Sequence, residues 1–133
     1  MSHKFHLRVY YEDTDLAGIV YYANYLKFVE RARSTLVREA DIDQNELKDA
    51  HGLVFTVRRL QAEYFAPARM NDELWVETTV RQLSGARIVF SQDVYRDGVM
   101  LFSGIITVAC ATLDGKAARV PAEIRAKLAK ATP

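Results

Sequence analysis

The chain has 133 residues, half of them hydrophobic, and its 18 basic and 17 acidic side chains give a formal net charge of +1. This length predicts one domain over residues 1–133, and the balanced charge argues against nucleic acid as a partner, which clustered Lys and Arg would bind. Cys110 is the only cysteine, so an internal disulfide is excluded. With no apolar signal core and no run of ~18 apolar residues, we expect a cytoplasmic protein without a membrane span.

The first third of the chain contains three patterns. Apolar and polar residues alternate over 5–11, which predicts a half-buried strand. The acidic segment 12–18 is closed by a glycine and predicts a loop. Over 22–40 the apolar residues recur at intervals of three and four, which predicts a long amphipathic helix. The polar segment 41–52 has no clear period and is compatible with a short helical turn.

The rest of the chain has the pattern of strands separated by short turns. The apolar phase shifts between Val57 and Leu60, which indicates a bulge in the first of these strands. Asp97 and Gly98 predict a two-residue hairpin turn, and Pro121 is typical of the first turn of a short terminal helix. The expected strands cover residues 54–65, 74–81, 88–96 and 99–113.

This order of elements predicts the fold class. One strand, one long helix and then four strands with short connections make an α+β chain with an antiparallel sheet. A single helix covers one face of such a sheet, yet apolar residues such as Trp75 and Tyr95 are expected on both faces. We therefore expect a second subunit to cover the remaining face or edge, which makes the protein a homodimer.

The loop before the long helix contains a pattern suited to chemistry. A carboxylate, Asp15, is followed by a glycine turn at Gly18 and then by the expected helix start near Tyr22. The first N–H groups of a helix have no internal partner and carry a partial positive charge, so they can bind an oxyanion. A carboxylate held beside them provides the two parts needed to hydrolyse an activated carbonyl. The alternative is that Asp15 only caps a turn or favours the helix dipole.

Metal and cofactor sites are disfavoured by the spacing of their candidate ligands. Asp13, Asp15 and Gly18 match three positions of a calcium loop, but Ala17 and Asn24 stand where two further ligands belong. The three histidines are scattered, no His or Cys pair has zinc spacing, and no phosphate-binding glycine loop occurs. We therefore expect neither a metal nor a cofactor.

Two separated blocks resemble a known family. The first is residues 9–25, VYYEDTDLAGIVYYANY, continued by FVERAR at 28–33, and the second is residues 57–69, VRRLQAEYFAPAR. Both resemble the hotdog-fold acyl-CoA thioesterases of the 4-hydroxybenzoyl-CoA thioesterase superfamily, most closely the branch associated with the Tol-Pal system. The resemblance covers nearly the whole chain and includes the order of the strands.

The resemblance implies a hotdog fold, in which a five-stranded antiparallel sheet wraps a long central helix, and it implies dimers joined edge to edge, or tetramers. The family's catalytic Asp corresponds to Asp15, and its carbonyl-polarising backbone N–H corresponds to that of Tyr22. This branch commonly has His at that position, a change that leaves the backbone N–H in place. Arg87 corresponds to a basic position used for nucleotide phosphates, and Tyr21 and Tyr25 are candidates to line the acyl pocket.

The predicted activity is hydrolysis of a small or medium acyl-CoA, or of the same acyl group on acyl carrier protein, to the free acid. Asp15 either attacks the carbonyl carbon or deprotonates a water molecule. Hydration or dehydration of a hydroxyacyl thioester is a competing activity, but it needs a histidine near the helix and none is placed there. A second alternative is a non-catalytic acyl-thioester binding or scaffold protein of a cell-envelope complex, which Tyr22 in place of His favours.

Overall fold

A computed structural model describes residues 2–131, in which five strands, three α-helices and a short 3-10 helix are formed. The strands are β1 (His3–Arg8), β2 (Leu53–Tyr64), β3 (Glu73–Ser84), β4 (Arg87–Arg96) and β5 (Val99–Thr112). The helices are the 3-10 helix η1 (Tyr11–Asp13), α1 (Asn24–Glu39), α2 (Gln44–His51) and α3 (Ala122–Lys130).

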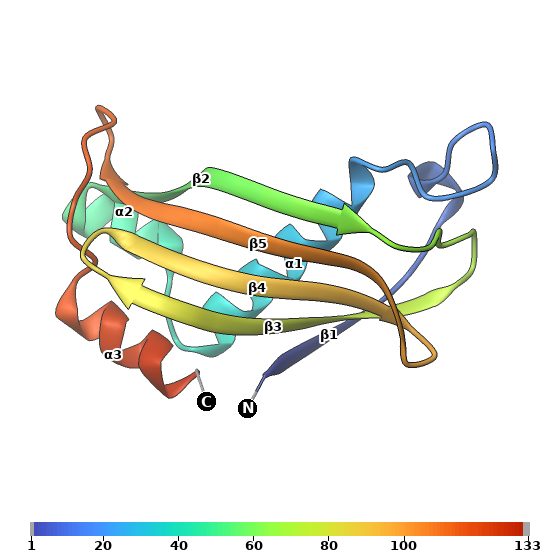
Figure 1. The fold of residues 1–133 in the computed structure, drawn as a ribbon. Coiled ribbons are helices and arrows are strands. Elements are labelled where there is room, and N and C mark those ends of the chain that lie inside the picture. The colour runs from blue at the N-terminus through green and yellow to red at the C-terminus, as the bar shows by residue number, and fades with distance from the viewer. Residues whose placement is uncertain (1, 132–133) are drawn as a thin grey trace.

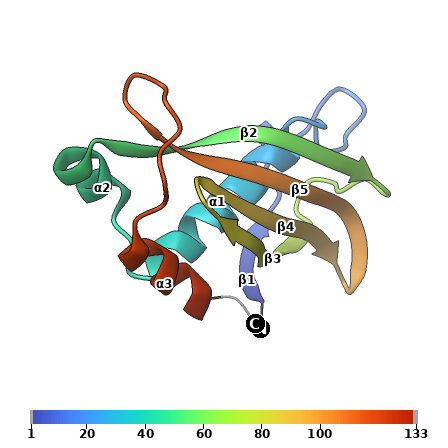
Figure 2. The same cartoon turned by 60° about the vertical axis from the view of Figure 1, so that its left-hand side comes forward.

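All five strands belong to one antiparallel sheet with the order β1-β3-β4-β5-β2. The strands β3, β4 and β5 follow one another as hairpins, while β1 and β2 form the two edges. The sheet curves around α1, which lies across one of its faces, and α2 and α3 gather at one end (Figures 1 and 2). This is the predicted α+β hotdog fold.

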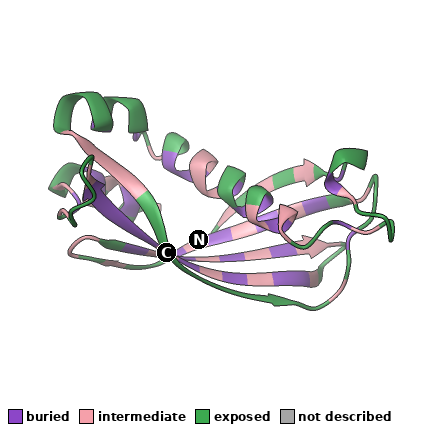
Figure 3. Ribbon diagram, turned by 90° about the horizontal axis from the view of Figure 1, so that it is seen from above, coloured by how far each residue is buried: buried purple, intermediate pink, exposed green. Residues whose placement is uncertain are grey.

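The core lies between α1 and the face of the sheet that α1 covers. The apolar stripe of α1 is buried at Tyr25, Phe28, Val29, Ala32 and Leu36, as its helical spacing predicts. Buried and half-buried residues alternate along β3 and β4 (Figure 3), with the buried set toward the helix. Each large apolar side chain buried in this way stabilises the fold by about 1.5–3 kcal/mol.

A buried polar contact joins α1 to the centre of the sheet. Gln92 is fully buried on β4, and its amide nitrogen donates to the Val29 carbonyl (2.8 Å) and to the Thr78 hydroxyl (2.9 Å). Its amide oxygen accepts a hydrogen bond from the Arg33 guanidinium at 2.9 Å. Because an unpaired buried amide would be destabilising, this set of partners fixes where α1 crosses β4.

The opposite face and the β2 edge also carry apolar groups. Trp75 stacks on Tyr95 with ring centroids 4.4 Å apart, on the side of the sheet away from the buried Val76 and Val94. This confirms that large apolar residues lie on both faces. At the β2 edge, Leu60 is 41% exposed although it lies on the same side as α1.

The bulge and the hairpin turn are found where the sequence predicts them. The register of β2 against β5 shifts between Val57 and Arg59. Asp97 and Gly98 both have positive φ, at 51° and 79°, as the two-residue turn requires. The polar segment after α1 forms the eight-residue helix α2, longer than the single turn expected.

Three predicted boundaries were wrong at the N-terminal end of the fold, where the first strand already begins at His3 rather than at residue 5. The first strand ends at Arg8 rather than at residue 11, because the Tyr10 N–H donates to the Asp13 carboxylate (2.8 Å) and the chain turns into η1. The long helix begins at Asn24 rather than at Tyr22, because the Asn24 N–H donates to the Tyr21 carbonyl (2.8 Å) in a tight turn. No helix among residues 2–131 is long and apolar enough to span a membrane.

Candidate active site

The loop between β1 and α1 is organised by Asp13. This residue is buried, its carboxylate accepts the Tyr10 N–H, and its backbone carbonyl accepts the Tyr21 N–H (2.9 Å). The same carbonyl also accepts the side-chain amide of Asn24 at 2.9 Å. These contacts tie the acidic loop directly to the start of α1, a role for Asp13 that the sequence did not suggest.

Asp15 begins a tight turn that returns the chain toward the helix. Its N–H donates to the Ile19 carbonyl (2.9 Å), its carbonyl accepts the Gly18 N–H (3.0 Å), and its carboxylate accepts the Ala17 N–H (2.9 Å). Gly18 has φ +81°, a conformation that favours glycine over residues with a side chain. The predicted Gly18 therefore shapes the turn, while the Asp15 carboxylate remains exposed to solvent.

Tyr22 lies in a tight turn just before α1. The Asn24 N–H bonds to the Tyr21 carbonyl, and the Leu26 N–H bonds to the Ala23 carbonyl at 3.1 Å. Within the part of the chain that the structure describes, the N–H groups of Tyr22 and Ala23 make no hydrogen bond. Two backbone donors are therefore available at the positive end of the α1 dipole.

The Asp15 turn and the start of α1 form one side of a pocket of about 360 Å³. The end of β2 and the segment after it form the other side of the pocket. The end of β2 and the start of α1 lie at the same end of the molecule (Figure 1). The lining residues are Asp15, Ile19, Val20, Tyr21, Tyr22, Tyr25, Tyr64, Phe65, Ala66 and Pro67. The structure thus brings together four of the predicted residues, Asp15, Tyr21, Tyr22 and Tyr25, in an apolar pocket with one carboxylate.

An aromatic cluster forms the inner wall of the pocket. Tyr25 is 3% exposed and stacks on Phe102 with centroids 5.4 Å apart, while Tyr64 meets both rings edge-on. The Tyr25 hydroxyl accepts the Ala68 N–H (3.0 Å), and the Tyr64 hydroxyl donates to the Tyr22 carbonyl (2.8 Å). Burial raises the pKa of both Tyr25 and Tyr64 above the ordinary tyrosine value, so both phenols are protonated at neutral pH.

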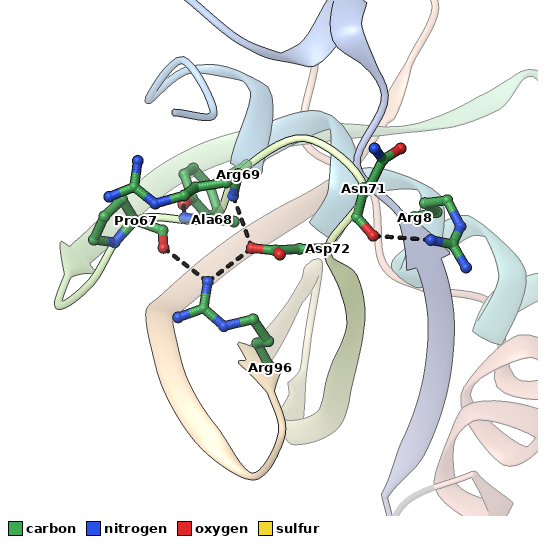
Figure 4. A network of polar contacts seen from close by, with 8 residues as sticks. Arg8, Pro67, Ala68, Arg69, Asn71, Asp72 and Arg96 are labelled. Atoms are coloured by element: carbon green, nitrogen blue, oxygen red, sulfur yellow. Dashed lines mark hydrogen bonds and ion pairs between the residues drawn. The ribbon is translucent and has the colours of Figure 1, made fainter. Parts of the chain in front are cut away.

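The segment 65–72, which continues the wall, is held by an ion pair (Figure 4). The Arg96 guanidinium donates to the Asp72 carboxylate (2.7 Å) and to the Pro67 carbonyl (3.1 Å), and the Arg69 N–H donates to the same carboxylate (2.8 Å). Partial burial alone would raise the pKa of Asp72, but the Arg69 N–H and Arg96 outweigh it and hold this pKa below its usual value. The Ile19–Arg69 bridge then joins the segment to the Asp15 turn.

Sequence reasoning did not identify Tyr64, Phe65 and Pro67 as site residues. The apolar phase of Leu60, Ala62 and Tyr64 after the bulge places Tyr64 on the helix side of the sheet, and this was the available signal. The contact with Tyr22 spans 42 positions and follows no local pattern.

Arg87, in contrast, lies far from the pocket within one chain. It begins β4 and pairs with Ser84 and Ala109, whereas the pocket wall lies level with Val94 and Phe102. Seven residues of strand separate Arg87 from Val94, which corresponds to about 24 Å. Among residues 2–131, no group of three His, Cys, Asp or Glu side chains is placed to hold a metal ion.

Comparison with known proteins identifies the family. Residues 17–103 match the model of the Thioesterase superfamily. The chain is 42% identical over 123 residues to the acyl-CoA thioesterase YbgC of Haemophilus influenzae, covering 92% of this chain and 90% of that protein. It is 39% identical over 105 residues to the acyl-CoA thioester hydrolase YbgC of Escherichia coli, covering 78% of each chain. The chain therefore belongs to the thioesterase superfamily, which confirms the predicted enzyme class.

Solved structures of the same fold agree with this assignment. A probable thioesterase from Bartonella henselae is 33% identical and superimposes with a TM-score of 0.86, covering 91% of this chain and 100% of that one. A mutant 4-hydroxybenzoyl CoA thioesterase complexed with 4-hydroxybenzoyl CoA has a TM-score of 0.90, covering 96% of this chain and 98% of that one. At 21% identity, this second structure establishes the likeness of fold alone.

Proposed function

We propose that this protein hydrolyses the thioester of a small or medium acyl-CoA to the free acid and CoA, at the pocket that Asp15 lines. The observation that carries the proposal is that Asp15, which is exposed, and Tyr22, whose N–H makes no hydrogen bond among the described residues, both line one apolar pocket at the start of α1. The acyl-CoA substrates named for the two YbgC relatives support the same substrate class.

The reaction uses the two polar parts of the pocket. The thioester oxygen accepts a hydrogen bond from the Tyr22 N–H, and the α1 dipole stabilises the negative charge that develops on it. Asp15 either attacks the carbonyl carbon, giving an anhydride that water then opens, or accepts a proton from a water molecule that attacks directly. In both routes the carbon–sulfur bond breaks, the CoA sulfur leaves as a thiolate that takes up a proton, and water supplies the new oxygen of the acid.

The active assembly that we propose is a homodimer or homotetramer. The outer edge of β2 has no strand beside it among the described residues, and Val57, Leu60 and Tyr64 expose apolar surface there on the helix side. Pairing with a second copy would satisfy the edge and cover this surface. Arg87 can then contact the CoA phosphates only if it comes from another copy of the chain.

The decisive experiment measures CoA release from short, long and aromatic acyl-CoAs with a thiol reagent. We expect Asp15→Asn to lower kcat/KM by at least about a hundredfold, because it keeps the side-chain shape and removes the charge. Asp49→Asn is the matched control, since Asp49 is exposed on α2, outside the pocket. Near wild-type turnover by Asp15→Asn would contradict the proposal.

The alternative of a non-catalytic scaffold is supported by one feature, the side chain of Tyr22 where the resembling branch has His. Tyr22 is 61% exposed and places a phenol where that branch has an imidazole. The same set of short, long and aromatic acyl-CoAs distinguishes the two functions. Binding of acyl-CoA without release of thiol by the wild-type protein would favour the scaffold.

A further inference from the structure

The hydrogen bonds at the start of α1 depart from those of a regular helix. In an α-helix beginning at Tyr22, the Tyr22 carbonyl would accept the Leu26 N–H, four residues later. Instead, the Leu26 N–H bonds to the Ala23 carbonyl and the Asn24 N–H bonds to the Tyr21 carbonyl, which is 3-10 spacing. The Tyr22 carbonyl accepts the Tyr64 hydroxyl at 2.8 Å.

This arrangement fixes the two peptide groups on either side of Tyr22 separately. The peptide group that contains the Tyr22 N–H is held by Asn24 through the Tyr21 carbonyl. The peptide group that contains the Ala23 N–H is held by Tyr64 through the Tyr22 carbonyl. Both N–H groups lack a partner among residues 2–131, so both can serve as donors to an oxyanion.

The Tyr64 side chain is well suited to hold a backbone group in place. It lies at the end of β2, pairs with Phe102 in register, and packs edge-on against the rings of Phe102 (5.1 Å) and Tyr25 (5.5 Å). Its hydroxyl is 2.8 Å from its acceptor and keeps its proton at neutral pH. A hydrogen bond to a peptide carbonyl also polarises the N–H of the same peptide group, which strengthens it as a donor.

We propose that Tyr64 is a positioning residue for thioester hydrolysis: its phenol holds and polarises the peptide group between Tyr22 and Ala23, so that two backbone donors face the substrate oxygen. The inference rests on the proposed function of the Asp15 pocket. It assigns to the end of β2 a part in the reaction beyond that of a pocket wall.

The first test is the variant Tyr64→Phe, which removes one hydroxyl and keeps the ring. We expect kcat to fall about tenfold with KM within about twofold, because the lost interaction orients the donors and leaves the acyl pocket intact. The control is Tyr95→Phe, which removes a phenol from the opposite face of the sheet and should leave kcat unchanged. The melting temperature of Tyr64→Phe should fall by no more than about 5 °C. An unchanged kcat, or a change in KM alone, would overturn the proposal.

The second test does not depend on turnover. In the NMR spectrum of the free protein, the Ala23 amide proton should move upfield in Tyr64→Phe, because the carbonyl of its peptide group loses a hydrogen bond, and it should stay in place in Tyr95→Phe. An unmoved Ala23 amide would refute the positioning role. If the wild-type protein released no thiol from any acyl-CoA, the proposed function would fail, and the amide shift would still report whether Tyr64 holds the turn.

The third test reads the substrate carbonyl directly. Benzoyl-CoA bound to Asp15→Asn should show a thioester carbonyl stretch lowered by the backbone donors, and adding Tyr64→Phe should raise that frequency toward its value in water. Equal frequencies in the two proteins would contradict the proposal.

Discussion

The start of α1 and the start of α2 differ in how their backbone N–H groups are bonded. At α2 the Asp43 side chain accepts the N–H groups of Asn45 (2.9 Å) and Glu46 (3.1 Å), so the helix is capped. At α1 the capping position is Ala23, which has no side-chain acceptor, and the first turn contains no acidic residue. A carboxylate is nevertheless close to α1, on the separate Asp15 turn. On the proposed function, the N–H groups at the start of α1 stay open to the thioester oxygen, whereas the Asp43 cap of α2 serves stability.

Giving α1 the cap that α2 has should produce the largest effect. Ala23→Asp supplies a carboxylate that accepts N–H groups of the first helical turn, as Asp43 does in α2, and places a negative charge beside the Tyr22 and Ala23 N–H groups that repels the developing oxyanion. We expect kcat to fall by about a hundredfold or more while the helix gains about 0.5–1 kcal/mol in stability. Ala23→Asn supplies a capping side chain without the negative charge, so it should lose less activity than Ala23→Asp. Activity equal to wild type in Ala23→Asp, measured by thiol release, would show that the open helix start has no part in the reaction.

The wall that faces the open helix start should weaken in acid. Because the folded pKa of Asp72 lies below its unfolded value, its ion pair stabilises the protein above about pH 4, and this stabilisation is lost as pH falls through the folded pKa. Asp72→Asn should lower the free energy of unfolding by about 1–2 kcal/mol at pH 7. The difference from wild type should shrink below pH 4 in urea titrations. A constant difference from pH 7 to pH 2 would contradict this role of the Arg96–Asp72 pair.

Removing the cap of α2 should have the smallest effect on function. Asp43→Ala leaves the Asn45 and Glu46 N–H groups without their acceptor, and we expect a loss of about 1 kcal/mol in stability. The kcat should remain within about twofold of wild type, because α2 lies at the opposite end of the sheet from the end of β2 and the start of α1 (Figure 1), whose residues line the pocket. Thermal unfolding and thiol release measure the two quantities. A large loss of kcat here would remove the distinction between the two helix starts.

The parts of the fold that could be predicted from the sequence are those that depend on residues close together in the chain. The stripe of α1, the hairpin turn at Asp97 and Gly98 and the bulge after Val57 each follow from neighbouring residues. The predicted start of α1 was wrong by two residues. Apolar spacing contains no information about the Tyr22 carbonyl, which accepts the Tyr64 hydroxyl instead of a helical N–H.

The candidate site was predictable only in its first half. Asp15, Tyr21, Tyr22 and Tyr25 lie close together in the sequence and were identified through one motif. The other half depends on contacts between distant segments, such as Tyr64 with Tyr22 and Arg96 with Asp72, 24 positions apart. Single hydrogen bonds of this kind need only one donor and one acceptor, so they leave no repeating pattern in the chain.

The bulge in β2 determines which of its side chains line the proposed site. If Arg58 were paired with β5 instead of being accommodated in the bulge, strand alternation would turn Arg59, Gln61 and Glu63 toward α1, and Leu60 and Tyr64 toward the other face. The strand would still pair with β5, yet the pocket would exchange a phenol for a carboxylate opposite Asp15. Deletion of Arg58 is therefore expected to keep Leu60 and Tyr64 toward α1, whereas the same residues in a strand without the bulge would preserve the sheet and lose the site. The phase of β2 after the bulge, and not its pairing with β5, therefore places a phenol in the proposed pocket.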